Sequence, residues 1–560
     1  MSTEIHCYIR LRFSYFPKGG KSTGKVEYAG RVRYFLFFLS ICAVAQNFER
    51  AFAELTETRL RADLTFLTAE PLKGRLSLER GSDVAAHWIV SEFTKAGLKP
   101  AANWSYLQTV PLVEYRGDRE KSGVTLTVNG VAKTYRSPEA SATFPRNVSI
   151  KGPVVFAGFG ITAPELGYDD YKGLDVRGKV VLIFDHEPQE DNAASRFSGK
   201  GNTRYAGTFV KVRTAQEHGA TAVLLMPEPN RKHPSNEERR ARIPGSVQRN
   251  ARMPLQTLAD SELQIPMVSL SEALGKELVA TTGRAANAIH TAIDATLQAQ
   301  SAVLPGVDVA IEIVNAEVKK ADGYNVVGLL EGTDLKAETI LITAHYDHDG
   351  PAFNLGALFP GADDNGSGTV GVVALAHAFV KSGVKPRRSI LFAIFAAEER
   401  GLLGSYYYAS HPLRPLAGTR AVINFDMIGR DEQKSTQTDG LIEIAADTSN
   451  EMNLVGAYYS PDYAKVVEKA NEHVGLRLNS KWDMEPALNV FFRSDQYPFV
   501  LKDIPAMWWF TGFHPDYHQV TDTVGRINFS KMVKILKLAY RSTLDFANTA
   551  TPPKFVAVTK

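Results

Sequence analysis

The sequence predicts an α/β fold with a mixed, mostly parallel twisted sheet flanked by helices, and an inserted β-rich domain. Apolar runs of strand length, at 340–344 and 390–396, alternate with segments whose apolar residues recur at helical spacing, such as 370–379. The inserted domain is predicted because the pattern changes, from about Ser141, to short apolar β runs such as 152–161.

Along the chain, residues 53–113 show mainly helical spacing, and a hairpin is expected around Asn129-Gly130. Two long strands are expected between 307 and 332, with a turn at Asp322-Gly323. The patterns divide the chain into a leader (1–45), a first section of the main domain (53–135), the inserted domain (136–290), the remainder of the main domain (305–548) and a loosely held tail (549–560).

Residues 1–45 have the pattern of a signal peptide. Basic residues precede the apolar run 34–45, which closes on the small-residue motif Ala43-Val44-Ala45. This run is shorter than the ~20 residues that span a bilayer, so we expect export to the periplasm or the extracellular space without a permanent membrane span. A lipid-bearing Cys42 is a minor alternative.

Composition narrows the classes of partner. The whole chain has a formal net charge of +3, but the leader carries seven Lys or Arg and two Asp or Glu, so the remainder is slightly acidic. A nucleic-acid partner is therefore not expected. Both cysteines, Cys7 and Cys42, lie in the leader, so neither a disulfide nor a cysteine metal ligand is expected after it.

Acidic and histidine residues follow the predicted strands of the main domain. His345 and Asp347 end one strand, Glu398 and Glu399 end the next, and Asp426 ends a third. A glycine-rich turn between the first two strands carries Asp363 and Asp364. Because ligands bind at the carboxyl ends of parallel strands, these groups are expected to converge. Imidazole together with carboxylates favours zinc or a similar divalent ion.

The order of these motifs resembles the M28 family of di-zinc peptidases. The resemblance rests on His345-x-Asp347, the string GADDNGSG at 361–368, Glu398-Glu399, the string NFDM at 424–427, and Tyr517-His518. The segment that interrupts the main domain resembles the protease-associated (PA) domain that many members carry. The resemblance implies the fold of a zinc exopeptidase with a PA insertion, which we expect to lie near the site as a partial lid.

The resemblance also implies a ligand set for two Zn²⁺ ions, with Co²⁺ or Mn²⁺ as alternatives. Asp364 would bridge both ions, with His345 and Asp426 completing one and Glu399 and His518 completing the other. Asp363 stands next to the bridging position, and only its place in the motif argues against it as the bridge. The Asp364-Asn365 peptide bond is expected to be cis.

Four further roles are implied. Glu398 would be the general base that takes a proton from a metal-activated water, and Asp347 would orient the His345 imidazole. Tyr517 would donate a hydrogen bond to the oxyanion, unless it only packs beside the site. Arg493 would lie near the substrate's terminal amine, unless it is a structural arginine that pairs with Asp495. The remaining histidines named by the pattern are expected to be surface or core residues: His348, His377, His411, His473 and His514.

The function implied is an exopeptidase that removes N-terminal residues from peptide substrates. Three alternatives remain open on the same fold: a carboxypeptidase, a glutaminyl-cyclase-like enzyme with one zinc, and a non-catalytic receptor-like binding protein. The complete ligand set argues against the last two. The sequence makes no prediction of oligomeric state.

Overall fold

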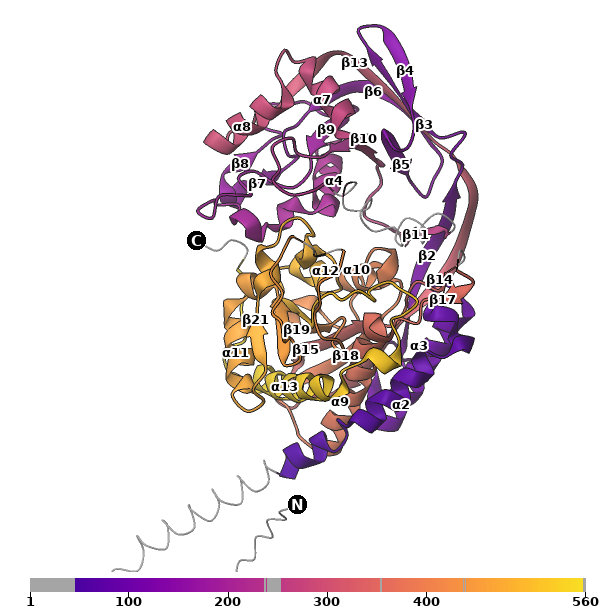
Figure 1. Cartoon of the computed structure of the whole chain (residues 1–560), viewed down its shortest axis with the longest axis vertical. Helices are drawn as coiled ribbons and strands as arrows, with labels where there is room; N and C mark the ends of the chain where they lie inside the picture. The colour runs from indigo at the N-terminus through magenta and orange to yellow at the C-terminus, as the bar shows by residue number, and fades with distance from the viewer. Residues whose placement is uncertain are drawn as a thin grey trace, which may run out of the picture.

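The computed structural model describes residues 46–556 except 236–237, 239–252, 353–354, 437 and 439. Within this range the chain forms two units, each built around its own sheet, and long strands run between them (Figure 1). The predicted leader, 1–45, and the last residues of the predicted tail, 557–560, lie outside the described residues.

The larger sheet has ten strands in the order β11-β2-β14-β18-β15-β19-β22-β20-β21, with β1 paired to β14. Its strands are β1 (Lys99–Pro100), β2 (Leu107–Gly117), β11 (Leu255–Leu258), β14 (Asn315–Leu330), β15 (Leu335–His345), β18 (Arg388–Phe395), β19 (Thr419–Phe425), β20 (Glu451–Val455), β21 (Arg477–Asn479) and β22 (Ala506–Phe510). The central neighbours β18, β15, β19 and β22 are parallel, and antiparallel pairs flank them. The predicted mixed α/β class is confirmed.

Helices cover both faces of this sheet, which explains why its central strands are apolar throughout. Ile340 and Ile342 of β15 pack in the core beneath one set of helices, whereas Leu341 packs in the core on the opposite face. The first set is α2 (Glu57–Leu67), α3 (Arg80–Ala96), α9 (Gly368–Ser382), α11 (Pro461–Asn471) and α13 (Phe529–Asn548); the second face carries α10 (Leu403–Ser410) and α12 (Tyr497–Val500) (Figure 1).

The smaller unit contains an eight-stranded sheet in the order β4-β3-β13-β6-β9-β10-β12-β5. Its strands are β3 (Gly123–Val128), β4 (Val131–Tyr135), β5 (Ala140–Thr143), β6 (Val148–Phe156), β9 (Val180–Phe184), β10 (Ala222–Met226), β12 (Met267–Leu270) and β13 (Ala302–Ile313). Three helices, α4 (Thr208–Glu217), α7 (Glu272–Ala280) and α8 (Ala286–Thr296), complete it. Two-stranded pairs occur outside the main sheets: β7 (Thr162–Ala163) with β8 (Tyr168–Asp169), and β16 (Pro351–Ala352) with β17 (Ala357–Leu358).

This sheet reaches beyond the predicted inserted domain, 136–290, on both sides. The hairpin β3–β4, expected in the main domain, pairs with β13, which in turn pairs with β6. Strand pairing therefore moves 123–135 and 302–313 into the smaller unit. The predicted turn at Asp322-Gly323 is not formed. Both residues lie inside the single strand β14, paired with Pro111 and Val110 of β2.

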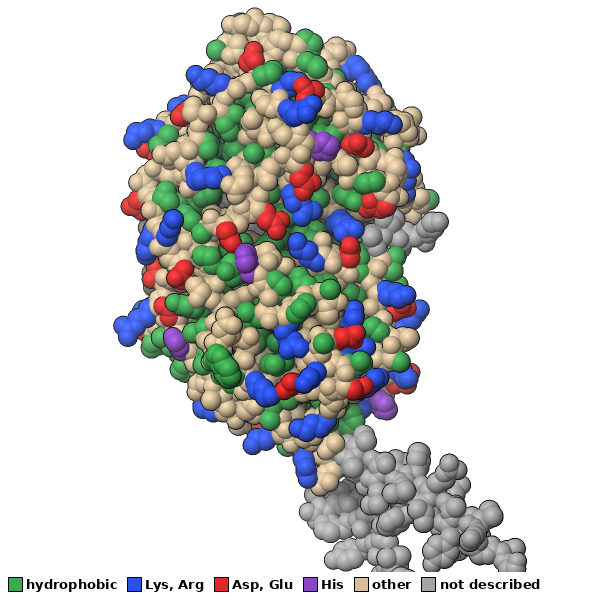
Figure 2. Space-filling model, turned by 180° about the vertical axis from the view of Figure 1, so that it is seen from behind, with side chains coloured by type: hydrophobic (Ala, Val, Ile, Leu, Met, Phe, Trp, Pro, Cys, Tyr) green, Lys and Arg blue, Asp and Glu red, His purple; other side chains and the backbone are tan. Residues whose placement is uncertain are grey.

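The two units touch at several points. Tyr459 donates its hydroxyl hydrogen to the carbonyl oxygen of Gly201 at 2.5 Å, and the Phe209 and Tyr406 rings stack with centroids 4.8 Å apart. The short strand β11, reached from the smaller unit, pairs with β2 of the larger sheet. On the face shown in Figure 2, basic and acidic side chains are interspersed over both units. Among the described helices, none is long and apolar enough to cross a membrane.

Candidate active site

The predicted ligands follow the carboxyl ends of the central parallel strands. His345 is the last residue of β15, Glu398 and Glu399 follow β18, and Asp426 follows β19. His518 lies in the segment after β22. Because these four strands are parallel neighbours, their carboxyl ends share one edge of the sheet, and the five side chains meet there.

Asp364 reaches the same edge from the turn that begins α9. The Asp364-Asn365 peptide bond is cis, as expected. The Asn365 side chain fixes this turn, since its Nδ2 donates to the carbonyl oxygen of Phe425 at 2.8 Å and its Oδ1 accepts the Gly368 N–H at 2.9 Å. A Cβ at Gly368 would lie 2.3 Å from Asn365 Oδ1, so only glycine fits this approach.

The side chains form two adjoining groups around Asp364. In the first, His345 Nε2 lies 3.6 Å from a carboxylate oxygen of each of Glu398 and Asp426. In the second, His518 Nε2 lies 3.7 Å from Glu399 Oε1. Asp364 Oδ1 is 3.6 Å from His345 Nε2, and its Oδ2 is 2.8 Å from His518 Nε2. Asp364 therefore offers one oxygen to each group.

The imidazoles are oriented from behind by carboxylates and a carbonyl group. His345 Nδ1 lies 3.2 Å from the carbonyl oxygen of Asp347 and 3.8 Å from its Oδ1. The Asp347 carboxylate accepts the main-chain N–H groups of Glu398 at 3.0 Å and Glu399 at 3.3 Å. His518 Nδ1 lies 2.8 Å from Asp349 Oδ2. Both Nδ1 atoms thus face oxygen, which directs Nε2 of each ring toward the shared centre.

Two neighbours of this site were not singled out by the sequence. Asp349 supports His518, and His348, expected to be an ordinary surface or core residue, is fully buried with Nδ1 2.8 Å from Glu399 Oε1. The available signal was the string HYDHDG at 345–350, in which a buried strand ends on His345 and three more acidic or histidine residues follow it.

Asp363, the neighbour that might have replaced Asp364, points elsewhere. Its Oδ1 accepts the Gly429 N–H at 2.6 Å, and its Oδ2 lies 3.2 Å from Nε2 of the buried His514. These contacts engage both of its oxygens away from the two imidazoles. His514 is accordingly a buried residue paired with a carboxylate, as is His377 beside Glu92.

Arg493 and Tyr517 lie together beside the site. Arg493 Nη2 donates to the Tyr517 hydroxyl at 3.3 Å, and the guanidinium carbon is 5.5 Å from the centroid of the Phe513 ring. The next residue, Ser494, donates its hydroxyl hydrogen to Asp426 Oδ2 at 2.6 Å. Asp495 is fully buried, and burial raises the pKa of its carboxyl to about 7.

The electrostatics of the cluster favour cations. Burial raises the pKa of the Glu398 carboxyl well above its usual range, and burial together with Glu399 and Asp426 does the same to Asp364. Burial would lower the pKa of His345, but the surrounding carboxylates, Glu398 first, raise it well above its usual range. His345 Nε2 is buried without a hydrogen-bond partner. The residues present therefore fit divalent metal ions, which would balance the crowded carboxylates.

Two family models match parts of this chain. Residues 325–543 match the family model of peptidase family M28, and residues 150–278 match the model of the PA domain. Leucine aminopeptidase 2 of Trichophyton equinum is 29% identical over 245 residues, which cover 40% of this chain and 44% of that protein. The match thus spans less than half the length of this relative.

A second relative matches over a longer region. The probable lipoprotein aminopeptidase LpqL of Mycobacterium tuberculosis is 26% identical over 434 residues, which cover 73% of this chain and 69% of that protein. Among solved structures, an aminopeptidase from Aneurinibacillus sp. strain AM-1 is 19% identical with a TM-score of 0.48, and the match covers 92% of this chain and 98% of that chain. On the two family matches, residues 325–543 are similar to peptidase family M28, and residues 150–278 are similar to the PA domain.

Proposed function

We propose that this chain is an exported di-metal aminopeptidase that removes N-terminal residues from peptides. The observation that carries the proposal is the position of Asp364, whose two oxygens face two different imidazoles, each accompanied by further carboxylates. A shared carboxylate of this kind is what two neighbouring divalent ions require to offset their repulsion.

His345 and Asp426 would hold one ion, and Glu399 and His518 the other, with Asp364 shared between them. Nitrogen and carboxylate ligands suit zinc, and also Co²⁺ or Mn²⁺. When bound, such ions polarise the scissile carbonyl group and lower the pKa of a water molecule. A glutaminyl-cyclase-like enzyme, which uses one zinc ion, would need only one of these two sets of ligands.

Glu398 is suited to move the proton. Its main-chain N–H is fixed by Asp347, and burial raises its affinity for a proton. Glu398 takes a proton from the attacking water and passes it to the leaving amine as the peptide bond breaks. Glu399, the adjacent residue, faces His518 instead, so the two glutamates have separate tasks.

Tyr517 is suited to stabilise the oxyanion. Arg493 can only donate hydrogen bonds, so the Tyr517 hydroxyl oxygen accepts in their contact, which holds the hydroxyl group beside the site. A donor aimed at the developing negative charge is worth about 10²–10³ in kcat when the geometry is right.

The direction of cleavage follows from charge. A substrate's terminal ammonium is attracted by carboxylates, and Glu398 and Asp426 lie at the centre of the site. A carboxypeptidase would instead need a cation that binds the substrate's terminal carboxylate, and Arg493 could serve as that cation. Its contact with Tyr517, and the naming of both relatives as aminopeptidases, favour the aminopeptidase.

The PA domain is proposed to act as a partial lid. Met253, which precedes β11, has its Sδ 3.0 Å from Nη2 of Arg400, the residue after Glu399. Tyr459 and Gly201 add a second contact between the units. Export is supported by the pattern of residues 1–45 and by a relative described as a lipoprotein.

The proposal is tested with the purified protein lacking residues 1–45. Peptides with a free amino terminus should be shortened residue by residue, a chelator should stop the reaction, and added zinc should restore it. Cyclisation of N-terminal glutamine without hydrolysis would show a glutaminyl-cyclase-like enzyme. Binding of peptides without turnover in the zinc-loaded protein would contradict the enzyme assignment.

A further inference from the structure

A second cluster of histidine and glutamate residues lies in the PA domain, apart from the active site. His186 and Glu190 follow β9, and Glu228 and His233 follow β10. Strands β9 and β10 are parallel neighbours, so their carboxyl ends bring both loops to the same edge of the smaller sheet. The arrangement repeats, in a different sheet, the principle that assembles the active site.

The four side chains point at one another. His186 Nδ1 lies 2.6 Å from Glu190 Oε1, and His233 Nε2 lies 2.9 Å from Glu190 Oε2 and 3.1 Å from Glu228 Oε1. The two imidazole rings stack with centroids 4.5 Å apart. One ligand atom from each of the four residues lies within 4.8 Å of the other three. A tetrahedral zinc site, with bonds of about 2.0–2.1 Å, separates its ligand atoms by roughly 3.3 Å.

Burial makes this cluster unlike an exposed group of charges. The side chains of His186 and Glu228 are each 5% exposed, and that of His233 is 9% exposed. Glu228 Oε1 and His233 Nε2 are both buried and form no well-aligned hydrogen bond, so the ion-pair contacts above are their only partners among the described residues. Buried polar atoms without hydrogen bonds are costly, and a metal ion between them would satisfy both.

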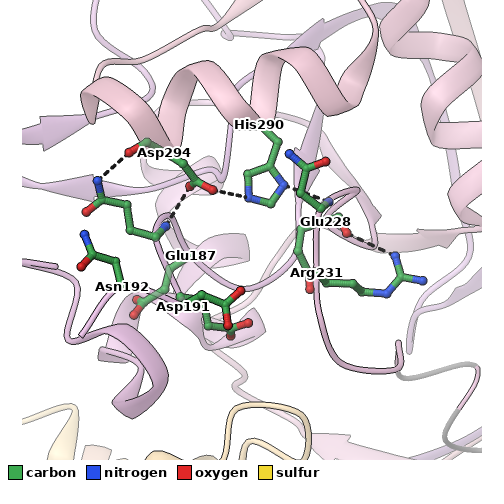
Figure 3. A pocket seen from close by; sticks show the side chains of 10 residues that line it. Glu187, Asp191, Asn192, Glu228, Arg231, His290 and Asp294 are labelled. Atoms are coloured by element: carbon green, nitrogen blue, oxygen red, sulfur yellow. Dashed lines mark hydrogen bonds and ion pairs between the residues drawn. The ribbon is translucent and has the colours of Figure 1, made fainter. Parts of the chain in front are cut away.

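A pocket of about 240 Å³ adjoins the cluster, and Glu190 and Glu228 form part of its wall. Glu187, Asp191 and Asp294 also line this pocket, so its wall is rich in oxygen atoms (Figure 3). Arg231, also in the wall, is paired with Glu272 at 2.6 Å and with Glu238 at 3.2 Å. The pocket thus offers a cation a path to the cluster.

We propose that His186, Glu190, Glu228 and His233 form a separate binding site for one divalent ion of the zinc class. Two imidazoles and two carboxylates are the donors that zinc takes in four-coordinate sites, whereas calcium and magnesium favour oxygen alone. Two carboxylates and two neutral imidazoles would carry a charge that one divalent ion balances. The competing arrangement has two protonated imidazoles paired with the carboxylates, without a metal ion.

The position of the site suggests a structural role between the units. His186 Nε2 lies 3.3 Å from Nδ2 of Asn489, and Asn489 Oδ1 accepts a hydrogen bond from Asn202 Nδ2 at 3.0 Å. Asn489 belongs to the larger unit, four residues before Arg493. The cluster therefore lies beside a contact between the PA domain and the peptidase unit, and an ion held there would also steady that contact.

The test is zinc content. The protein lacking residues 1–45 is loaded with zinc, freed of loosely bound metal, and compared with His233→Gln and Glu228→Gln by atomic emission. Each variant should hold one ion fewer than the wild type, whatever number the active site binds. The matched control is His218→Gln, another histidine of the PA domain that stacks on Tyr171, and it should hold as many ions as the wild type.

Anomalous diffraction at the zinc edge provides the second readout, independent of the folding of any variant. A peak within bonding distance of His186 Nδ1 and His233 Nε2 is expected in the wild type. Equal zinc content in the wild type and both cluster variants, with no such peak, would overturn the proposal and leave imidazolium–carboxylate pairing as the role of the cluster. Loss of peaks around Asp364 alone would instead contradict the proposed active site.

Discussion

The carboxylate of Asp347 accepts a hydrogen bond from the main-chain N–H of Glu398, with 3.0 Å between Oδ1 and N. The other oxygen accepts the Glu399 N–H, and the Asp347 carbonyl oxygen faces His345 Nδ1. One residue thus connects the ends of β15 and β18 and sets the positions of both glutamates.

Replacement of Asp347 by asparagine should therefore reduce catalysis without unfolding the protein. The amide NH₂ would face one of the two N–H groups and shift Glu398 or Glu399. We expect kcat to fall about 10- to 100-fold, the usual effect of losing a residue that orients metal ligands. Steady-state kinetics and zinc content measure this, and an unchanged kcat in Asp347→Asn would contradict the positioning role.

Glu398→Gln and Glu399→Gln should separate the two neighbouring glutamates. The amide at 398 cannot accept a proton, so kcat should fall about 10²–10⁴-fold while zinc content stays at the wild-type level. Glu399→Gln should lose zinc. Atomic emission and kinetics on both variants provide the comparison, and the opposite pattern would mean that the two roles are reversed.

Tyr517→Phe removes the hydroxyl group that Arg493 holds. If this group donates to the oxyanion, kcat should fall by up to about 10²–10³-fold with little change in KM. Tyr407→Phe, on a partly exposed tyrosine that stacks on His411, is the control and should leave kcat unaffected. A rise in KM at constant kcat in Tyr517→Phe would show that the residue contributes to substrate binding only.

Stability at acid pH should depend on Glu92, which joins α3 to α9. Its hydrogen bond with His377, supported by Lys95, lowers its pKa from the ordinary 4.5 to about 2. A carboxylate whose pKa is depressed by folding stabilises the protein above its unfolded pKa and loses this effect as pH falls through the folded value.

Glu92→Gln should therefore reduce the free energy of unfolding at pH 7 by about 1.5–3 kcal/mol, the range for hydrogen bonds to charged groups. The difference from the wild type should shrink as pH falls from 4.5 toward 2. Urea unfolding at several pH values measures it. Glu70→Gln, on an exposed glutamate beside Lys73, should change little at any pH. A difference independent of pH would exclude the ionic contribution of Glu92.

The sequence predicted the central strands because buried parallel strands have continuous apolar runs. It predicted the residues at their ends because those residues form short, recognisable motifs. It did not predict where the smaller sheet ends. The hairpin 123–135 and the strand 302–313 belong to that sheet through pairing between distant segments, which local patterns do not specify. Pairing with β2 likewise keeps Asp322-Gly323 extended, although this dipeptide is typical of a turn.

The sequence also did not predict the directions in which the side chains near the site point. The sequence placed His348 and Asp349 next to the motif, but only the path of the chain after β15 brings His348 to Glu399 and Asp349 to His518. For Asp347, the sequence predicted support of the His345 imidazole. The structure gives that contact mainly to the carbonyl oxygen and directs the carboxylate to Glu398 and Glu399.

The central claim, cleavage from the amino terminus at a carboxylate-rich centre, is tested most directly with one good peptide substrate in three forms. Acetylation of its amino terminus should reduce kcat/KM by about 10⁴–10⁵-fold, as expected when a site built for a polar group meets a substrate that lacks it. Amidation of its carboxyl terminus should have little effect. The reverse pattern, with cleavage insensitive to acetylation and abolished by amidation, would contradict the aminopeptidase assignment.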